Sequence, residues 1–127
     1  YWTIEHKTSI PLEWRPAIGT ALFGCDRCTA VCPWNRFGSH LVPPGLDARP
    51  TPSPAECLTM AAPDFNRRFA GTTVERTGLE RLQRNAAIVL GNSADPATGP
   101  ALELALRQSS SPLVREHAAW ALHRLQQ

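Results

Sequence analysis

The sequence predicts a mostly α-helical protein, and three features of the chain carry this prediction. Two similar apolar segments, residues 82–90 and 114–122, lie at an offset of 32 residues in the C-terminal half. A Pro-rich stretch before them is unsuited to a helix or a central strand. Three of the four cysteines lie N-terminal to that stretch. We therefore divide the 127-residue chain into a cysteine-containing unit, 1–37, a connection, 38–53, and a helical domain, 54–127.

Composition places few limits on function. The formal net charge of +2 does not by itself indicate a nucleic-acid-binding protein. No apolar run approaches the length of a membrane span and no secretory signal is present, so we expect a soluble cytoplasmic protein. We also expect the protein to be a monomer. The clustered cysteines suggest a metal-type motif in a reducing compartment. Because the chain begins at Tyr1 without a methionine, we expect it to be part of a longer protein.

The N-terminal residues are expected to contain short elements only. Residues 1–7 mix aromatic, β-branched and polar side chains, which is typical of a short extended segment. Pro11 then favours the start of a short helix through Ile18, and Gly19 follows the expected helix end. This helix would lie next to the segment that contains Cys25, Cys28 and Cys32 (residues 24–35, the cysteine segment) and cover it.

Cys25, Cys28 and Cys32 form a C-x2-C-x3-C pattern that is followed by Pro33. This pattern is the end of the bacterial iron–sulfur motif C-x2-C-x2-C-x3-C-P, with Leu22 in place of the first cysteine. In two-cluster ferredoxins the last cysteine ligates the other cluster. The pattern therefore predicts a partial ferredoxin-like [4Fe–4S] unit whose ligand set is completed elsewhere. Apolar side chains near the thiols would exclude water from such a cluster, or would simply form core: Trp14, Leu22, Phe23, Trp34 and Phe37.

Other interpretations of the cysteines stay open. The three thiolates and His6 or His40 could bind zinc, in a HEAT-type protein-interaction module. Three reduced thiols could also pack as small hydrophobic side chains. Cys57, the fourth cysteine, lies in a helical pattern and is expected to pack rather than to bind a metal. His6 could otherwise donate a proton near a redox centre, or simply bind the backbone.

Helix signals begin at the end of the Pro-rich stretch. Ser53 and Glu56 have the spacing of a capping box, and Pro54 fits the first helical position. A second short helix is expected over residues 63–70, before Gly71. The helical domain therefore opens with two short helices.

The two aligned segments, residues 82–90 and 114–122, predict paired helices with another apolar helix over 101–106 between them. Residues 86–90 are apolar on all sides, which indicates a helix packed between other elements. A repeat of this period, with small residues where helices cross, is typical of a HEAT-like α-solenoid.

Basic residues gather before and inside the first repeat. Guanidinium groups suit phosphate recognition, so a solenoid face could present them to a nucleic-acid backbone. Arg81 and Arg84 are about one helical turn apart. Alternatively, the group is a solvated face neutralised by Glu75 and Glu80. The candidate contact residues are Arg67, Arg68, Arg76, Arg81 and Arg84.

Several segments together resemble the C-terminal part of the epoxyqueuosine reductase family. They are residues 1–6, 15–19 and 24–37, with the Cys-Pro-Trp-Asn sequence, and residues 65–72 and 84–92, with Arg-Asn-Ala-Ala. The resemblance covers nearly the whole chain.

The resemblance implies an oxidoreductase that reduces epoxyqueuosine to queuosine in the anticodon region of tRNA. It implies two [4Fe–4S] clusters, a cobalamin bound by a domain outside this chain, a cellular electron donor, and a HEAT-like part that helps to hold tRNA. By the family pattern, Cys25 and Cys28 serve one cluster and Cys32 serves the other, with a further cysteine upstream of Tyr1. No catalytic residue is expected in this chain. The alternative is a ferredoxin-like electron-transfer unit of another cobalamin enzyme, such as a reductive dehalogenase.

Overall fold

The computed structural model describes residues 1–37 and 50–127, and in these residues the regular elements are helices, with no strand. The prediction of a mostly α-helical protein is therefore confirmed. The N-terminal unit contains α1 (Arg15–Ile18), α2 (Arg27–Ala30) and the 3-10 helix η1 (Pro33–Phe37). The rest contains α3 (Pro54–Thr59), α4 (Ala62–Phe69), α5 (Thr73–Thr77), α6 (Leu79–Asn92), η2 (Pro96–Thr98), α7 (Gly99–Gln108) and α8 (Pro112–Leu125).

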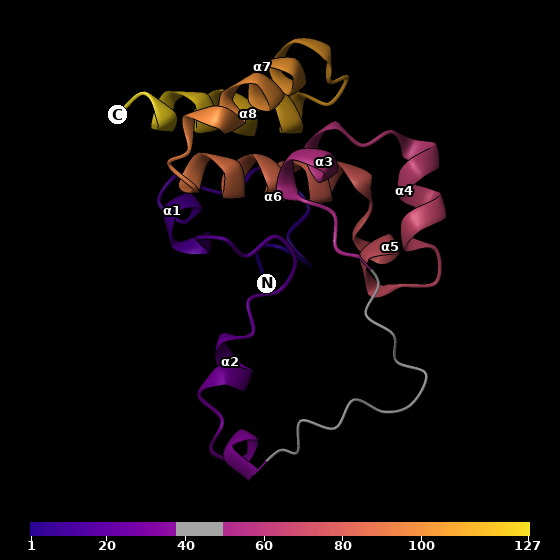
Figure 1. Cartoon of the computed structure of the whole chain (residues 1–127), viewed down its shortest axis with the longest axis vertical. Coiled ribbons are helices and arrows are strands. Elements are labelled where there is room, and N and C mark those ends of the chain that lie inside the picture. Colours follow the sequence, from indigo (N-terminus) through magenta and orange to yellow (C-terminus); the bar gives the residue numbers. More distant parts are fainter. Residues whose placement is uncertain (38–49) are drawn as a thin grey trace.

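Helix α6 lies at the centre of the molecule (Figure 1). It packs against α8 and α3, and the N-terminal segment with α1 lies along it. The apolar residues Ala86, Ala87 and Ile88 are all fully buried, which confirms that this helix is packed between other elements. The helix predicted between the two aligned segments is also present, as α7.

Small residues let α6 and α8 approach closely. A Cβ atom added to Gly91 of α6 would lie 2.7 Å from the Cβ of Ala121 and 2.8 Å from its Cα. Real Cβ atoms do not approach one another that closely, because van der Waals repulsion rises steeply at such distances. The crossing of the two aligned helices therefore requires glycine at position 91.

The start of α3 follows the capping-box prediction. The hydroxyl of Ser53 accepts the Glu56 N–H at 3.2 Å, and the Glu56 carboxylate accepts the Ser53 N–H at 2.7 Å. These hydrogen bonds from Ser53 lower the pKa of Glu56. The two backbone N–H groups, which would otherwise lack an acceptor in the helix, are thus satisfied reciprocally at the entrance to the helical domain.

Residues 1–7 are not extended, and that prediction is wrong. The carbonyl of Tyr1 accepts hydrogen bonds from the N–H groups of Glu5, at 2.9 Å, and His6, at 3.1 Å, so the segment forms a turn. The carbonyls of Trp2 and Thr8 both bind one guanidinium group. An extended chain rises about 3.3 Å per residue, which would put these two carbonyls roughly 20 Å apart.

The helix expected from Pro11 is shorter than predicted. Regular α-helix begins only at Arg15, with Pro16 in its first turn, and residues 12–14 form a turn. Gly19 ends the helix at a φ of 60°, as expected of a glycine beyond a helix C-terminus. Among the described residues, no helix has both the length and the apolar character that crossing a membrane requires.

Candidate functional site

The cysteine segment lies apart from the packed helices. Figure 1 shows α2 on a part of the chain that extends away from α6. The cysteine segment starts with two residues of positive φ, Gly24 at 71° and Asp26 at 48°. They flank Cys25 and turn the chain into α2, which carries Cys28.

The three thiols are free, but they do not converge in the described structure. Cys25 and Cys28 are exposed, Cys32 is half-buried, and none is in a disulfide. In residues 1–37 and 50–127, no three His, Cys, Asp or Glu side chains lie close enough to hold a metal ion. Soft, accessible thiolates fit three ligand positions of iron–sulfur clusters. A [4Fe–4S] cluster takes four ligands, so other residues would have to complete each set.

The apolar side chains near the thiols do not form a water-excluding layer. Trp34 is 79% exposed and Phe37 is 82% exposed, because the segment that carries them extends away from the helices. Trp14 stacks on Trp2 at 5.9 Å between ring centroids and is still 47% exposed. Leu22 instead packs against the core of the helical domain. The prediction of a water-excluding cover is therefore wrong for Trp34 and Phe37, and Leu22 follows the alternative of core packing. Phe23 is half-buried and lines the same groove as Cys25.

The remaining candidate ligands lie elsewhere. His6 Nε2 donates to the carbonyl of Ser9 at 3.0 Å, and the His6 ring packs against Trp2 at 4.8 Å. The structure therefore favours a backbone-binding role for His6, and it does not group His6 with the cysteines. His40, the other histidine of the zinc alternative, lies outside the described residues. Cys57 is fully buried, and burial raises the pKa of its thiol to about 11, which confirms its packing role.

Three of the candidate arginines lie on or near the surface of α4 and α5. Arg67 has a side chain that is 79% exposed and pairs with Asp64 at 2.6 Å. Arg76 is 71% exposed and pairs with Glu5 at 2.7 Å. Arg68 is half-buried and donates to a backbone carbonyl. Exposed pairs of this kind are weak, so the guanidinium groups can exchange their partners for phosphates.

The acidic partners expected from the sequence are bound elsewhere. Glu75 accepts the N–H of Gly71 at 2.8 Å, and Glu80 accepts the hydroxyl of Ser111. Neither forms an ion pair with a candidate arginine in the described structure.

Arg84 is fully buried, so its prediction as an RNA contact is wrong. Its guanidinium donates at 2.8 Å to each of three backbone carbonyls, those of Trp2, His6 and Thr8. Burial lowers the pKa of Arg84 to about 10, so the group is still charged at neutral pH. The side of α6 that bears Arg84 faces the N-terminal segment rather than solvent. The Arg84 guanidinium is therefore not available to donate to a phosphate.

Arg81 is half-buried on the same helix. It donates to the carbonyls of Thr77, of Arg76 at 2.8 Å and of Ile4 at 3.1 Å. Its main contacts are therefore also with backbone, and its role in RNA binding stays a prediction.

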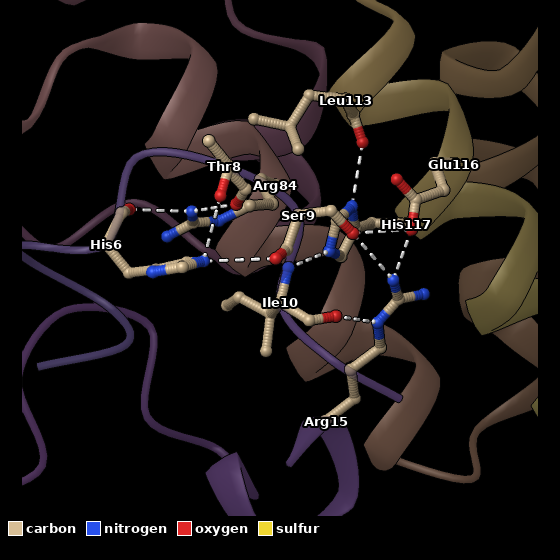
Figure 2. A network of polar contacts seen from close by, with 9 residues as sticks. All are labelled: His6, Thr8, Ser9, Ile10, Arg15, Arg84, Leu113, Glu116 and His117. Carbon is tan, nitrogen blue, oxygen red and sulfur yellow. Dashed lines mark hydrogen bonds and ion pairs between the residues drawn. The ribbon is translucent and has the colours of Figure 1, made fainter. Parts of the chain in front are cut away.

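Sequence reasoning missed a polar network between the N-terminal segment and α8 (Figure 2). Arg15 is 2% exposed, forms an ion pair with Glu116, and donates through Nε to the carbonyl of Ile10 at 2.8 Å. His117 is fully buried; its Nε2 accepts the N–H of Ile10 at 3.2 Å, and its Nδ1 donates to the carbonyl of Leu113 at 2.8 Å. These two bonds require the neutral imidazole, and burial lowers the pKa of His117 to about 4.

A signal for this network is present in the aligned segments. Each has a polar residue directly before its Ala-Ala pair, Asn85 in the first and His117 in the second. Both side chains are fully buried and bind the backbone of the N-terminal unit. A polar residue at an apolar position of a repeat thus indicates where another part of the chain is bound.

A groove of about 1060 Å³ lies beside the cysteine segment, between that segment, residues 50–52 and helices α3 to α5. Its lining is largely apolar and includes Phe23 and Phe69. Cys25, Arg27 and Arg68 also line it. The groove therefore brings one of the candidate thiols and one of the candidate arginines to the same surface.

No protein-family model matches the chain. Among curated proteins, the chain is 47% identical over 132 residues to an epoxyqueuosine reductase of Pseudomonas aeruginosa, and the match covers 98% of this chain and 35% of that protein. It is 41% identical over 125 residues to the corresponding protein of Xanthomonas campestris, covering 96% of this chain and 35% of the relative. The Escherichia coli relative is 36% identical over 126 residues, and the match covers 96% of this chain and 33% of that protein.

Solved structures give the same result. A crystal structure of epoxyqueuosine reductase with a tRNA-Tyr epoxyqueuosine-modified tRNA stem loop matches with a TM-score of 0.87 and 28% identity, covering 97% of this chain and 34% of that one. The Streptococcus thermophilus epoxyqueuosine reductase matches with a TM-score of 0.85, 28% identity and coverage of 97% and 33%. The chain thus spans about a third of the length of these relatives. The resemblance seen in the sequence is confirmed: in sequence and in fold, this chain is related to one third of an epoxyqueuosine reductase.

Proposed function

We propose that the chain is the part of an epoxyqueuosine reductase that supplies iron–sulfur ligands and tRNA contacts. The whole enzyme would be an oxidoreductase that converts epoxyqueuosine to queuosine in tRNA. The observation that carries this proposal is the 47% identity over nearly the entire chain to a protein of that name.

Within this function, Cys25 and Cys28 would be ligands of one [4Fe–4S] cluster and Cys32 of a second. The C-x2-C-x3-C-P pattern and the accessible, unpaired thiols support this assignment. Clusters held by these thiols would supply one-electron transfer, and a cobalamin held by another part of the enzyme would supply a strongly reducing cobalt. The role of this chain would be to hold the three thiols and to present them toward the rest of the protein.

A division of the chain into three parts belongs to the same proposal. Residues 1–37 would form a partial ferredoxin-type unit, residues 38–53 a connection, and residues 54–127 a HEAT-like domain in which α6 and α8 occupy equivalent places. The close crossing of these two helices at Gly91 and Ala121 favours a repeat of this kind. A reducing cytoplasmic setting belongs to the proposal, because free thiols persist there.

Transfer RNA is the proposed macromolecular partner. A relative of the same fold has been solved with a tRNA stem loop. In this chain, Arg67 and Arg76 are the most exposed candidates, and their guanidinium groups suit the phosphates of an A-form stem. Arg68 is half-buried and is proposed as a further contact. The monomeric state of the enzyme and the identity of its electron donor stay predictions.

Binding of a tRNA anticodon stem loop by the full-length protein tests the arginine assignment. The double variant Arg67→Gln, Arg76→Gln should bind more weakly, and the slope of log affinity against log salt should fall by about one for each phosphate that an arginine no longer neutralises. Arg107→Gln is the matched control, because Arg107 is also 79% exposed and pairs with a carboxylate of its own helix. Equal affinities and slopes for all three proteins would show that the α4–α5 arginines do not bind RNA.

The activity itself is tested with tRNA that carries epoxyqueuosine. The full-length protein, with cobalamin and a low-potential reductant, should convert the nucleoside to queuosine, with the loss of one oxygen atom seen by mass spectrometry. Cys28→Ser should abolish this conversion. A fully metallated protein that leaves epoxyqueuosine unchanged would contradict the proposal.

A further inference from the structure

The chain that leads into the cysteine segment is held by two amide side chains of α6. Asn92 donates to the carbonyl of Arg15, the first residue of α1, at 2.9 Å, and to that of Gly19, which follows the helix, at 3.2 Å. Asn85 donates to the carbonyl of Leu22 at 3.0 Å, three residues before the first cysteine. The backbone on both sides of residues 20–21 is thus attached to one helix.

Thr3 extends this attachment to the residue next to Cys25. The carbonyl of Thr3 accepts from the Asn85 amide at 2.7 Å, and its hydroxyl accepts the N–H of Gly24 at 3.0 Å. Thr3 is 6% exposed and Asn85 is fully buried, so water competes little for these bonds. A continuous chain of hydrogen bonds therefore runs from α6 through Thr3 to the backbone N–H of the residue just before Cys25.

The amide of Asn85 is itself held in one orientation. Its oxygen accepts from Arg84, from Nε at 3.2 Å and from Nη2 at 2.9 Å, and its nitrogen donates to the two carbonyls already named. The oxygen and the nitrogen of the Asn85 amide therefore each form the two hydrogen bonds that they can make. Arg84, which is too buried to contact RNA, thus orients the amide of Asn85, which binds the backbone that leads into the cysteine segment.

We propose that Thr3 and Asn85 are positioning residues for Cys25 and for the cluster that its thiolate ligates. This inference rests on the proposed function, because it takes the thiol as a cluster ligand. Gly24 has a φ of 71°, and glycine moves readily between left- and right-handed conformations unless its peptide group is fixed. The bond to Thr3 selects one conformation and so fixes the direction in which the next side chain leaves the backbone. Partners that orient a ligand in this way commonly change metal affinity about 10- to 100-fold when they are removed.

The experiment compares three substitutions in the full-length protein purified without oxygen. Thr3→Val removes the acceptor for the Gly24 N–H with little change in shape, and Thr3→Ser retains the hydroxyl. Thr77→Val is the matched control, because Thr77 is 2% exposed and its hydroxyl has no partner among the described residues. Two rates are measured: amide hydrogen exchange at Gly24, and loss of the visible cluster absorption to an iron chelator.

We expect Thr3→Val to raise the exchange rate at Gly24 roughly fivefold or more, the effect of removing one hydrogen bond. Cluster loss should be about 10-fold faster or more. Thr3→Ser should restore both rates, and Thr77→Val should change neither.

The outcomes separate this inference from the proposed function. A wild-type protein without iron and sulfide would refute the proposed function before any variant is compared. A wild-type protein that holds its cluster, with a Thr3→Val variant that exchanges faster at Gly24 yet loses the cluster at the wild-type rate, would overturn the positioning role alone. Cluster loss accelerated equally by Thr77→Val would also overturn it, since the effect would then reflect general destabilisation.

Discussion

Replacement of Arg84 by methionine tests whether this residue holds the N-terminal unit on α6. Methionine has a similar length and fills the same space, but it has no donor. The carbonyls of Trp2, His6 and Thr8 would each lose a hydrogen bond of 2.8 Å, and Asn85 would lose the group that orients its amide.

The expected loss of stability follows from the number of buried carbonyl groups that are left without a donor. Each such carbonyl costs about 1–3 kcal/mol, and removal of the buried guanidinium charge offsets part of this cost. We therefore expect the free energy of unfolding to fall by about 3 kcal/mol. Since a protein of this size is stable by only about 5–15 kcal/mol, the loss is a large fraction of the total.

The assay is urea-induced unfolding followed by tryptophan fluorescence, with a constant m-value as the check that the unfolded states are comparable. Arg67→Met is the control, because that side chain is 79% exposed and its loss should change stability by no more than about 0.5 kcal/mol. A loss below about 1 kcal/mol for Arg84→Met would refute the structural role assigned to Arg84.

Two further predictions concern the contacts of α8. The pKa of His117 is lowered from 6.5 to about 4 in the folded protein, so the neutral form stabilises the fold fully above pH 6.5 and this contribution is lost as pH falls toward 4. The melting temperature of wild type should therefore fall more steeply across that interval than that of His117→Gln, and equal slopes would contradict the assignment. Gly91→Ala should lower stability by about 1–3 kcal/mol through its clash with Ala121. Gly99→Ala, where the added methyl meets nothing within 4 Å, should not; equal unfolding midpoints for the two variants would argue against the close crossing.

The helical domain could be predicted from the sequence because its signals are local. The capping box at Ser53 and Glu56 depends on residues three apart, and it formed as predicted. The apolar character of residues 86–90 on all sides indicated a helix packed between others, and burial confirms it. Cys57, which lies in the same kind of apolar helical pattern, is likewise buried.

The N-terminal unit could not be predicted in the same way, because its conformation depends on distant residues. Arg84 binds carbonyls 76 to 82 positions away in the sequence, and these contacts turn residues 1–7 out of the extended form. A helical arginine in a basic cluster gives no local sign that it is buried. The polar residue before each Ala-Ala pair was the available signal, and it points to Asn85 and His117.

For the candidate site, the sequence identified the thiols but not their surroundings. The C-x2-C-x3-C-P spacing depends only on the chain, whereas shielding depends on what packs against the segment. Trp34 and Phe37 are exposed because α2 and η1 extend away from the helices. Leu22 at the position of the first cysteine indicates that a ligand comes from elsewhere, but the spacing within this chain does not indicate which residue supplies it.

The most direct test of the cluster assignment is the iron and acid-labile sulfide content of the full-length protein, isolated under nitrogen. Two [4Fe–4S] clusters predict about eight atoms of each per polypeptide, and Cys28→Ser should lose about half of both. Stoichiometric zinc without sulfide, or an unchanged iron content in Cys28→Ser, would contradict the assignment of these thiols as cluster ligands.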